Sequence, residues 1–228
     1  MKSYKFLFLF FFVSSSLSQA SEFIVISGGP ALRKWEKMRN PTHDVFWGNF
    51  VNSASSRFQQ IQPQSTSSDL LTWLVYRPSY ERRSTEEGQN LINLIETKAQ
   101  SLGVRLIWFN ETETVVNYLN SGQDRKDQPI QTLDFFGHSN KANWMFDYSN
   151  EIDACSTTFF HTRDLAQLKR GIFAKKAQVQ SWGCHSGEYY SQKFKEITGK
   201  KMVGAIGKTD YSGGGLPVLS SQNGKWAN

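Results

Sequence analysis

The chain has 228 residues, of which 39% are hydrophobic and 20% are charged, and its formal net charge is +6. This length and composition fit one folded domain with a sizeable core and exclude a disordered chain. The charge is too mild to indicate a nucleic-acid groove, and we expect the scattered basic residues to lie on solvated faces. These residues are Arg33, Lys34, Arg82, Arg83, Lys175, Lys176, Lys200 and Lys201.

The start of the chain has the pattern of a secretory signal peptide. Two lysines precede an apolar run at 6–13, and a serine-rich stretch ends at Ala20. The run is too short to span a bilayer. We therefore expect residues 1–20 to be removed and residues 21–228 to form a single exported domain, secreted or periplasmic, with no membrane anchor after cleavage. An uncleaved anchor is the alternative.

Apolar runs and their breakers predict alternating strands and helices along the mature chain. The strands are continuous apolar runs, which are typical of a parallel sheet buried on both faces. We expect strands at 23–27, 70–76, 104–109, 130–136, 177–182 and 202–206. We expect helices at 43–61, 86–101, 111–119, 162–172 and 186–198, polar loops at 62–69, 79–87 and 121–129, and a small hairpin at 144–147. These βαβ units predict a three-layer α/β/α sandwich with a mostly parallel sheet of about six strands.

Two of the predicted strands end in glycine followed by a reactive residue. The segment 134–140, DFFGHSN, carries His138, and the segment 180–187, QSWGCHSG, carries Cys184. Residues at the carboxyl ends of neighbouring strands line the ligand crevice of an open α/β sheet. The motifs therefore predict that a thiol and an imidazole meet at one edge of the sheet, as in a Cys/His nucleophilic site.

The residues around this pair suggest a role for each group. A cysteine must lose its proton before it attacks a carbonyl carbon. We expect His138 to carry the proton, and a helix beginning near Ser186 to direct its positive end at the Cys184 sulfur. The backbone N–H groups of Ser139 and Cys184 are the candidates for an oxyanion hole.

Together these features resemble the caspase-like cysteine peptidases, a superfamily that includes legumain, the gingipains, separase, the metacaspases and the bacterial CHAT domains. The shared pattern is a strand ending in Gly-His, followed along the chain by a strand ending in Gly-Cys. The resemblance covers most of the mature chain in element order and only the two short motifs in residues. The segment 23–30, FIVISGGP, is similar to the opening of the legumain-type branch.

The resemblance implies a caspase-like fold, with His138 as general base and acid and Cys184 as the nucleophile that forms an acyl-enzyme on a peptide carbonyl. Two residues depart from the family pattern. Ser139 stands where the family often has glycine, and the change keeps the backbone N–H. His185 directly follows the cysteine, where it either assists the thiolate or competes for it.

The substrate-binding residues are less well defined. In enzymes of this kind, the loops after the first, fifth and sixth strands line the pocket for the residue before the cleaved bond. Here those loops offer Gly28, Trp182 and Asp210. Asp210 favours a basic substrate residue, whereas Lys208 or Arg33 would favour an acidic one, and the weak preference is for a basic residue.

The chain has two cysteines, Cys155 and Cys184, so a disulfide between them is the main alternative. The protein would then be a non-catalytic binding module, and a third possibility is a different thiol hydrolase or amidase. We expect no metal and no cofactor, because the spacing of His138, Cys155, His161, Cys184 and His185 matches no usual zinc pattern. We expect a peptide or protein substrate and no nucleic-acid partner, and the sequence leaves the oligomeric state open.

Overall fold

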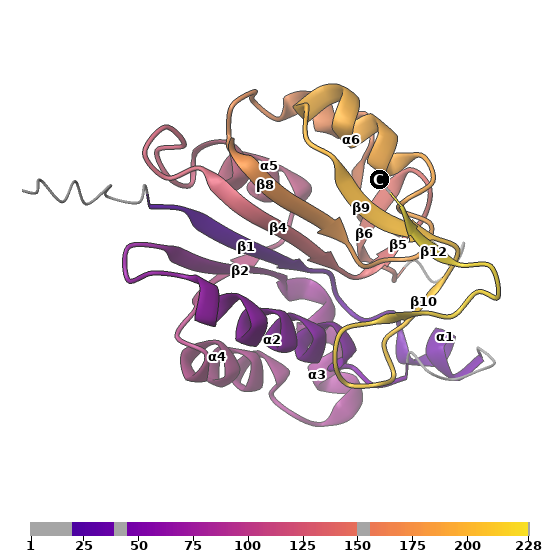
Figure 1. The fold of residues 1–228 in the computed structure, drawn as a ribbon. Helices are drawn as coiled ribbons and strands as arrows, with labels where there is room; N and C mark the ends of the chain where they lie inside the picture. The colour runs from indigo at the N-terminus through magenta and orange to yellow at the C-terminus, as the bar shows by residue number, and fades with distance from the viewer. Residues whose placement is uncertain (1–19, 39–44, 150–155, 228) are drawn as a thin grey trace, which may run out of the picture.

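The computed structural model describes residues 20–38, 45–149 and 156–227, which form a mixed α/β domain (Figure 1). A seven-stranded sheet in the order β12-β9-β8-β4-β1-β2-β3 lies between two layers of helices. Its strands pair in parallel, except that β12 is antiparallel to β9. The predicted three-layer α/β/α sandwich is confirmed, and β12 is a strand that the sequence did not reveal. Residues 1–19 of the predicted signal peptide lie outside the described residues.

The strands of the central sheet follow the apolar runs of the sequence. Alternate side chains enter opposite layers, so that Ile24 and Ile26 join one buried cluster and Val25 joins the other. Burial on both faces explains why the runs are continuous rather than alternating. The strands are β1 (Glu22–Ser27), β2 (Leu70–Tyr76), β3 (Arg105–Phe109), β4 (Ile130–Phe136), β8 (Phe173–Ser181), β9 (Met202–Ile206) and β12 (Lys225–Ala227).

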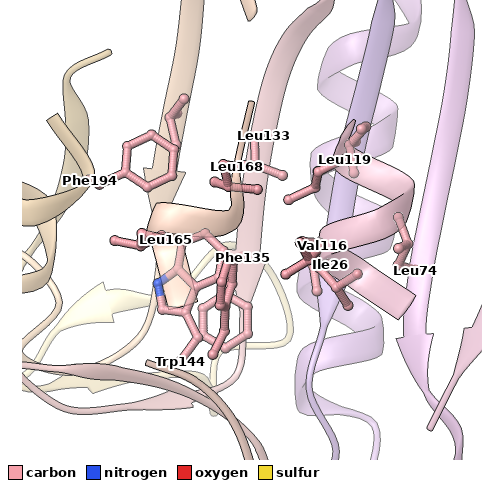
Figure 2. Close-up of a cluster of buried hydrophobic side chains, with 14 of the residues drawn as sticks. Ile26, Leu74, Val116, Leu119, Leu133, Phe135, Trp144, Leu165, Leu168 and Phe194 are labelled. Atoms are coloured by element: carbon pink, nitrogen blue, oxygen red, sulfur yellow. The ribbon is translucent and has the colours of Figure 1, made fainter. Parts of the chain in front are cut away.

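Helices cover both faces of this sheet. They are α1 (Arg33–Met38), α2 (Asn49–Ile61), α3 (Arg77–Glu87), α4 (Leu91–Ser101), α5 (Thr112–Ser121) and α6 (Tyr190–Thr198), with single 3-10 turns η1 (Gln62–Gln64) and η2 (Asp164–Gln167). The helices α2, α3 and α4 lie on one face, and α5 and α6 lie on the other (Figure 1). Figure 2 shows the second layer, where Leu119 of α5 and Phe194 of α6 belong to one buried cluster with Leu133 of β4.

Two small antiparallel sheets extend the strand ends. The first contains β5 (His138–Ser139), β6 (Asn143–Asp147) and β7 (Thr158–His161), so the hairpin predicted at 144–147 is part of a three-stranded sheet. The second pairs β10 (Thr209–Asp210) with β11 (Val218–Leu219). Both sheets follow strands at their carboxyl ends, where the predicted site residues lie.

The strand order reverses between β1 and β4. The chain runs from β1 outward to β2 and β3 and then returns to place β4 on the other side of β1. Open α/β sheets bind ligands in the crevice outside the carboxyl ends of the strands at such a reversal. Because β4 ends directly before Gly137 and His138, the histidine lies at this point of the sheet.

The segment 79–87 is not the predicted polar loop but most of helix α3. Pro78 suits the first helical turn, where an N–H has no helical partner, and Gly88 ends the helix at a φ of 65°. Polar contacts hold the helix, since Arg83 is 1% exposed and lies 2.6 Å from Glu36. Arg83 is therefore not on a solvated face, and without an apolar stripe the helix left no pattern in the sequence.

Three further helices are shorter than predicted. The segment 162–172 contains only the turn η2, because Leu168 is extended and Gly171 has a φ of 86° before β8 begins. The helix predicted at 86–101 begins at Leu91, where the Asn90 side chain accepts a hydrogen bond from the first turn. The helix predicted at 43–61 begins at Asn49, and β8 begins at Phe173, four residues before the strand predicted at 177–182.

Candidate active site

The structure brings the two motifs into contact. The Ser139 hydroxyl donates a hydrogen bond of 2.6 Å to the Cys184 carbonyl oxygen. Gly183 packs so closely on the first motif that a Cβ atom there would lie 2.2 Å from Ser139 Oγ and 2.8 Å from the Gly137 carbonyl oxygen. These contacts follow from the parallel pairing of β4 with β8, whose register puts Phe135 beside Ser181. The predicted meeting of the two strand ends is thus present.

Thr209 of β10 holds the Cys184 sulfur. The Thr209 N–H donates to Sγ over 3.4 Å, and the Thr209 hydroxyl lies 3.5 Å from Sγ. Among the described residues, the hydrogen-bond partner of the sulfur is Thr209 and not His138. Catalytic hydrogen bonds are often long without substrate and shorten when it binds. The sequence places Thr209 in the loop after β9, but no pattern in it pairs this residue with the thiol.

The His138 ring lies among aromatic side chains. Its centroid is 5.1 Å from that of Phe50 in an edge-on arrangement and 5.5 Å from that of Tyr148. Phe50 also meets Tyr211 edge-on at 4.8 Å, and the Tyr211 hydroxyl accepts a hydrogen bond from the Gly137 N–H. These rings pack around the half-buried imidazole, and only Tyr211 lies in a loop that the sequence predicted to line the substrate pocket.

The pairing of β5 with β6 sets the direction of the Ser139 N–H, one of the two predicted oxyanion donors. The Asn140 N–H donates to the Asn143 carbonyl oxygen, which closes the turn between β5 and β6. Hydrogen-bonded and non-bonded pairs alternate along an antiparallel ladder, so the next pair, Ser139 and Trp144, is non-bonded. The Ser139 N–H therefore points away from β6. Among the described residues, no hydrogen bond occupies the Cys184 N–H.

The helix expected at 186–198 begins later, which removes one predicted source of thiol activation. Helix α6 starts at Tyr190, and residues 183–189 form turns. The cause is a set of long-range contacts: the His185 N–H donates to Gly207, and the Gly187 N–H donates to Ala205 of β9. These N–H groups are committed to β9 and to the residue directly after it, so the positive end of α6 does not lie directly behind the sulfur.

A polar network surrounds His185. This residue adopts a φ of 58°, which is unusual for a residue other than glycine. Its Nδ1 donates to Glu188 Oε1 over 2.6 Å, and the Gly207 N–H reaches the same oxygen. Lys141, in the turn after β5, lies 2.8 Å from the other Glu188 oxygen. Glu188 thus joins three loops around Cys184.

This network predicts a pH-dependent contribution to stability. The Lys141 ammonium, with His185, lowers the pKa of Glu188 from 4.5 to about 2. Because the folded-state pKa is depressed, the contribution is present above the unfolded pKa and is lost as the pH falls from 4.5 toward 2. Glu188→Gln should lower the free energy of unfolding by about 1 kcal/mol at neutral pH, since the exposed Lys141 is screened by solvent.

Urea unfolding of Glu188→Gln and wild type at a series of pH values measures this contribution, and the gap should narrow as the solution is acidified. Glu81→Gln is the matched control, because Glu81 is half-exposed and pairs with Arg77 on the surface of α3. It should cost only a few tenths of a kcal/mol. A gap at neutral pH no larger than that of the control would contradict the role of Glu188.

The close packing of Gly183 gives a second prediction. Gly183→Ala should force the two strand ends apart and cost about 1–3 kcal/mol of stability. It should also slow alkylation of Cys184, because the Ser139 contact would be disturbed. Gly213→Ala is the control, since nothing lies within 4 Å of a Cβ atom there. Equal urea midpoints for the two variants would show that the contact tolerates an extra methyl group.

The three predicted substrate-binding residues lie in different surroundings. Gly28 is buried, and its N–H donates to Phe136 at the end of β4. Trp182 is 8% exposed and donates its indole N–H to Asp134, so its ring belongs to the core and we do not include it in the substrate site. Asp210 is half-buried beside Thr209, and its carboxylate accepts the Ser212 N–H.

Cys184 is a free thiol in the structure, while Cys155, its proposed disulfide partner, lies outside the described residues. His161 accepts the Arg163 N–H in the turn after β7 and is not part of this site. In the described ranges, no group of three His, Cys, Asp or Glu side chains is placed to hold a metal ion.

No protein-family model, curated protein or solved structure matches the chain. None of the described helices combines the length and apolar character needed to cross a bilayer.

Proposed function

We propose that this protein is an exported, caspase-like cysteine peptidase that cleaves peptide bonds through an acyl-enzyme on Cys184. The observation that carries the proposal is the 2.6 Å hydrogen bond from Ser139 to the Cys184 carbonyl oxygen. It joins the residue after the histidine to the cysteine itself. A substrate carbonyl at this edge of the sheet would meet a thiol, an imidazole and two candidate N–H donors.

In the proposed reaction, the Cys184 thiolate attacks the carbonyl carbon of the substrate, and the N–H groups of Ser139 and Cys184 stabilise the oxyanion. His138 donates a proton to the leaving amine as the carbon–nitrogen bond breaks. His138 then accepts a proton from water, whose oxygen attacks the thioester and releases the carboxylic acid and the thiolate. Thr209 orients the sulfur before the attack.

Alkylation of the full chain by an iodoacetamide probe near neutral pH tests the dyad. Digestion and mass spectrometry would give separate rates for Cys184 and Cys155, so that Cys155 serves as an internal reference. We expect rapid labelling of Cys184, slower labelling of it in His138→Ala, and no change in His161→Ala. If His138→Ala labels at Cys184 as fast as wild type, the imidazole does not act on the thiol.

The binding-module alternative makes the opposite prediction for the thiols. Titration of the unreduced, denatured protein should give two free thiols per chain for the peptidase and none for a Cys155–Cys184 bridge. Mass spectrometry of the exported protein tests the proposed secretion at the same time. We expect the mature N-terminus at Ser21.

A further inference from the structure

Lysines that are far apart in the sequence meet at the amino end of the sheet. Strand β8 carries Lys175 and Lys176, and its parallel pairing with β9 brings Lys200 and Lys201 alongside. Lys200 Nζ donates to the Lys175 carbonyl oxygen over 3.1 Å. Lys201 lines a cavity together with Ala177 of β8. The sequence predicted that these four lysines lie on solvated faces, and in the structure they lie together on one face.

An irregularity in the sheet presents the first two lysines to solvent. Ile130 of β4 pairs with Phe173 of β8, but Thr132 pairs with Gln178, so β8 holds extra residues in between. Both Lys175 and Lys176 fall within this bulge and are exposed. Their ammonium groups are therefore not committed to packing in either helical layer.

A cleft of about 610 Å³ adjoins these lysines at the start of β1. Lys126, from the loop before β4, lines it together with Lys175, Lys176 and Ser21. We call Lys126, Lys175, Lys176, Lys200 and Lys201 the basic face. Its acidic neighbours, Asp124 and Asp127, flank Lys126 in the same loop, so the lysines outnumber them.

The chain that precedes the domain reaches it in this cleft. The apolar run at 6–13 is joined to Ser21 by residues 14–20, which span at most about 25 Å when extended. In the anchored alternative, in which the leader is retained, an apolar run in the bilayer holds the basic face within about 25 Å of the lipid headgroups. Removal of the leader before Ser21 would add an α-amino group in the same cleft, where the Ser21 nitrogen donates to the Asp69 carboxylate over 2.7 Å, so this charge would be paired with an acid.

We propose that the basic face is a docking surface for an anionic membrane. Clustered lysines next to a membrane-inserted segment bind acidic headgroups by charge, and the attraction is strongest within a Debye length of the surface. The proposed active site lies at the opposite end of the strands, where the arrowheads of β1, β4 and β8 point in Figure 1. A docked molecule would therefore present Cys184 away from the lipid.

Co-flotation with vesicles tests the proposal on the protein as recovered from expression, after its N-terminus has been read by mass spectrometry. The vesicles contain phosphatidylcholine alone or with about one third phosphatidylglycerol. We expect binding to the anionic vesicles and its loss in about 0.5 M salt. Replacing Lys175, Lys176, Lys200 and Lys201 by glutamine should lower the partition coefficient at least about tenfold.

A variant with the same change in charge is the control. Lys34, Lys98, Lys195 and Lys225, which lie on α1, α4, α6 and β12, are replaced by glutamine in it. This control should bind anionic vesicles nearly as wild type does. Equal losses of vesicle binding in the two variants would show that net charge alone explains the binding, and would overturn the proposal. So would retention by duplex DNA with no binding to anionic vesicles.

Discussion

Cys184→Ala should abolish cleavage of a mixed peptide library by the full chain, with a loss of at least about a thousandfold in turnover. The reason is that the proposed reaction has no other nucleophile than this sulfur, which Thr209 holds at 3.4 Å. His138→Ala should cause a loss of similar order, since the proposed reaction has no other group to accept the thiol proton or to protonate the leaving amine.

The double variant distinguishes a catalytic pair from two separate effects. Groups that act as a unit give strongly non-additive losses, so Cys184→Ala with His138→Ala should cleave no more slowly than Cys184→Ala alone. Cys155→Ala and His161→Ala are the matched controls and should retain activity. Library cleavage by Cys184→Ala at the wild-type rate would exclude the thiol as nucleophile.

Arg125→Met should destabilise the fold by about 3–5 kcal/mol, because it leaves a buried carboxylate without its cation. Glu22, at the start of β1, is fully buried and forms an ion pair with Arg125. The same carboxylate accepts hydrogen bonds from Thr72 and Tyr118 at 2.5 and 2.6 Å. Arg125 also donates to the Leu119 carbonyl oxygen at the end of α5.

Urea unfolding of Arg125→Met measures this loss. The double variant Glu22→Gln with Arg125→Met should recover part of it, because no uncompensated charge then remains buried. Arg77→Met is the surface control: Arg77 and Glu81 are 40% and 51% exposed, so the change should cost at most about 1 kcal/mol. A loss for Arg125→Met as small as for the control would contradict the buried pair as an anchor of β1.

The central strands were predictable because each is a short apolar run that must be buried on both faces. Helix α3 was not, since many of its buried contacts are polar, among them an ion pair of Arg83 and a hydrogen bond from Tyr80 to Gly28. The sequence of a helix held by such contacts is as polar as that of a loop. The start of α6 was predicted too early for another reason. The N–H groups of His185 and Gly187 donate to the carbonyl oxygens of Gly207 and Ala205, and a local sequence pattern cannot predict acceptors so distant in the chain.

The candidate site was likewise predictable only in part. Two strands ending in Gly-His and Gly-Cys predicted the contact that Ser139 and Gly183 make. The residues that orient the reactive groups, Thr209 for the sulfur and Phe50 for the imidazole, come from other elements. Sequence spacing predicts which residues carry the chemistry more readily than which neighbours hold them, because the neighbours depend on tertiary packing.

The position of β4 in the sheet has a consequence for the timing of activity. β4 pairs with β1 on one side and β8 on the other, so it joins strands from distant parts of the chain. Non-local pairings of this kind form late in folding, since their loop-closure entropy is lost before their contacts are gained. Thr209, which contacts the sulfur, lies even later in the sequence than β8. In the proposed exported peptidase, a chain that crosses the membrane unfolded would therefore carry an unassembled active site, and cleavage would have to await the complete domain on the far side.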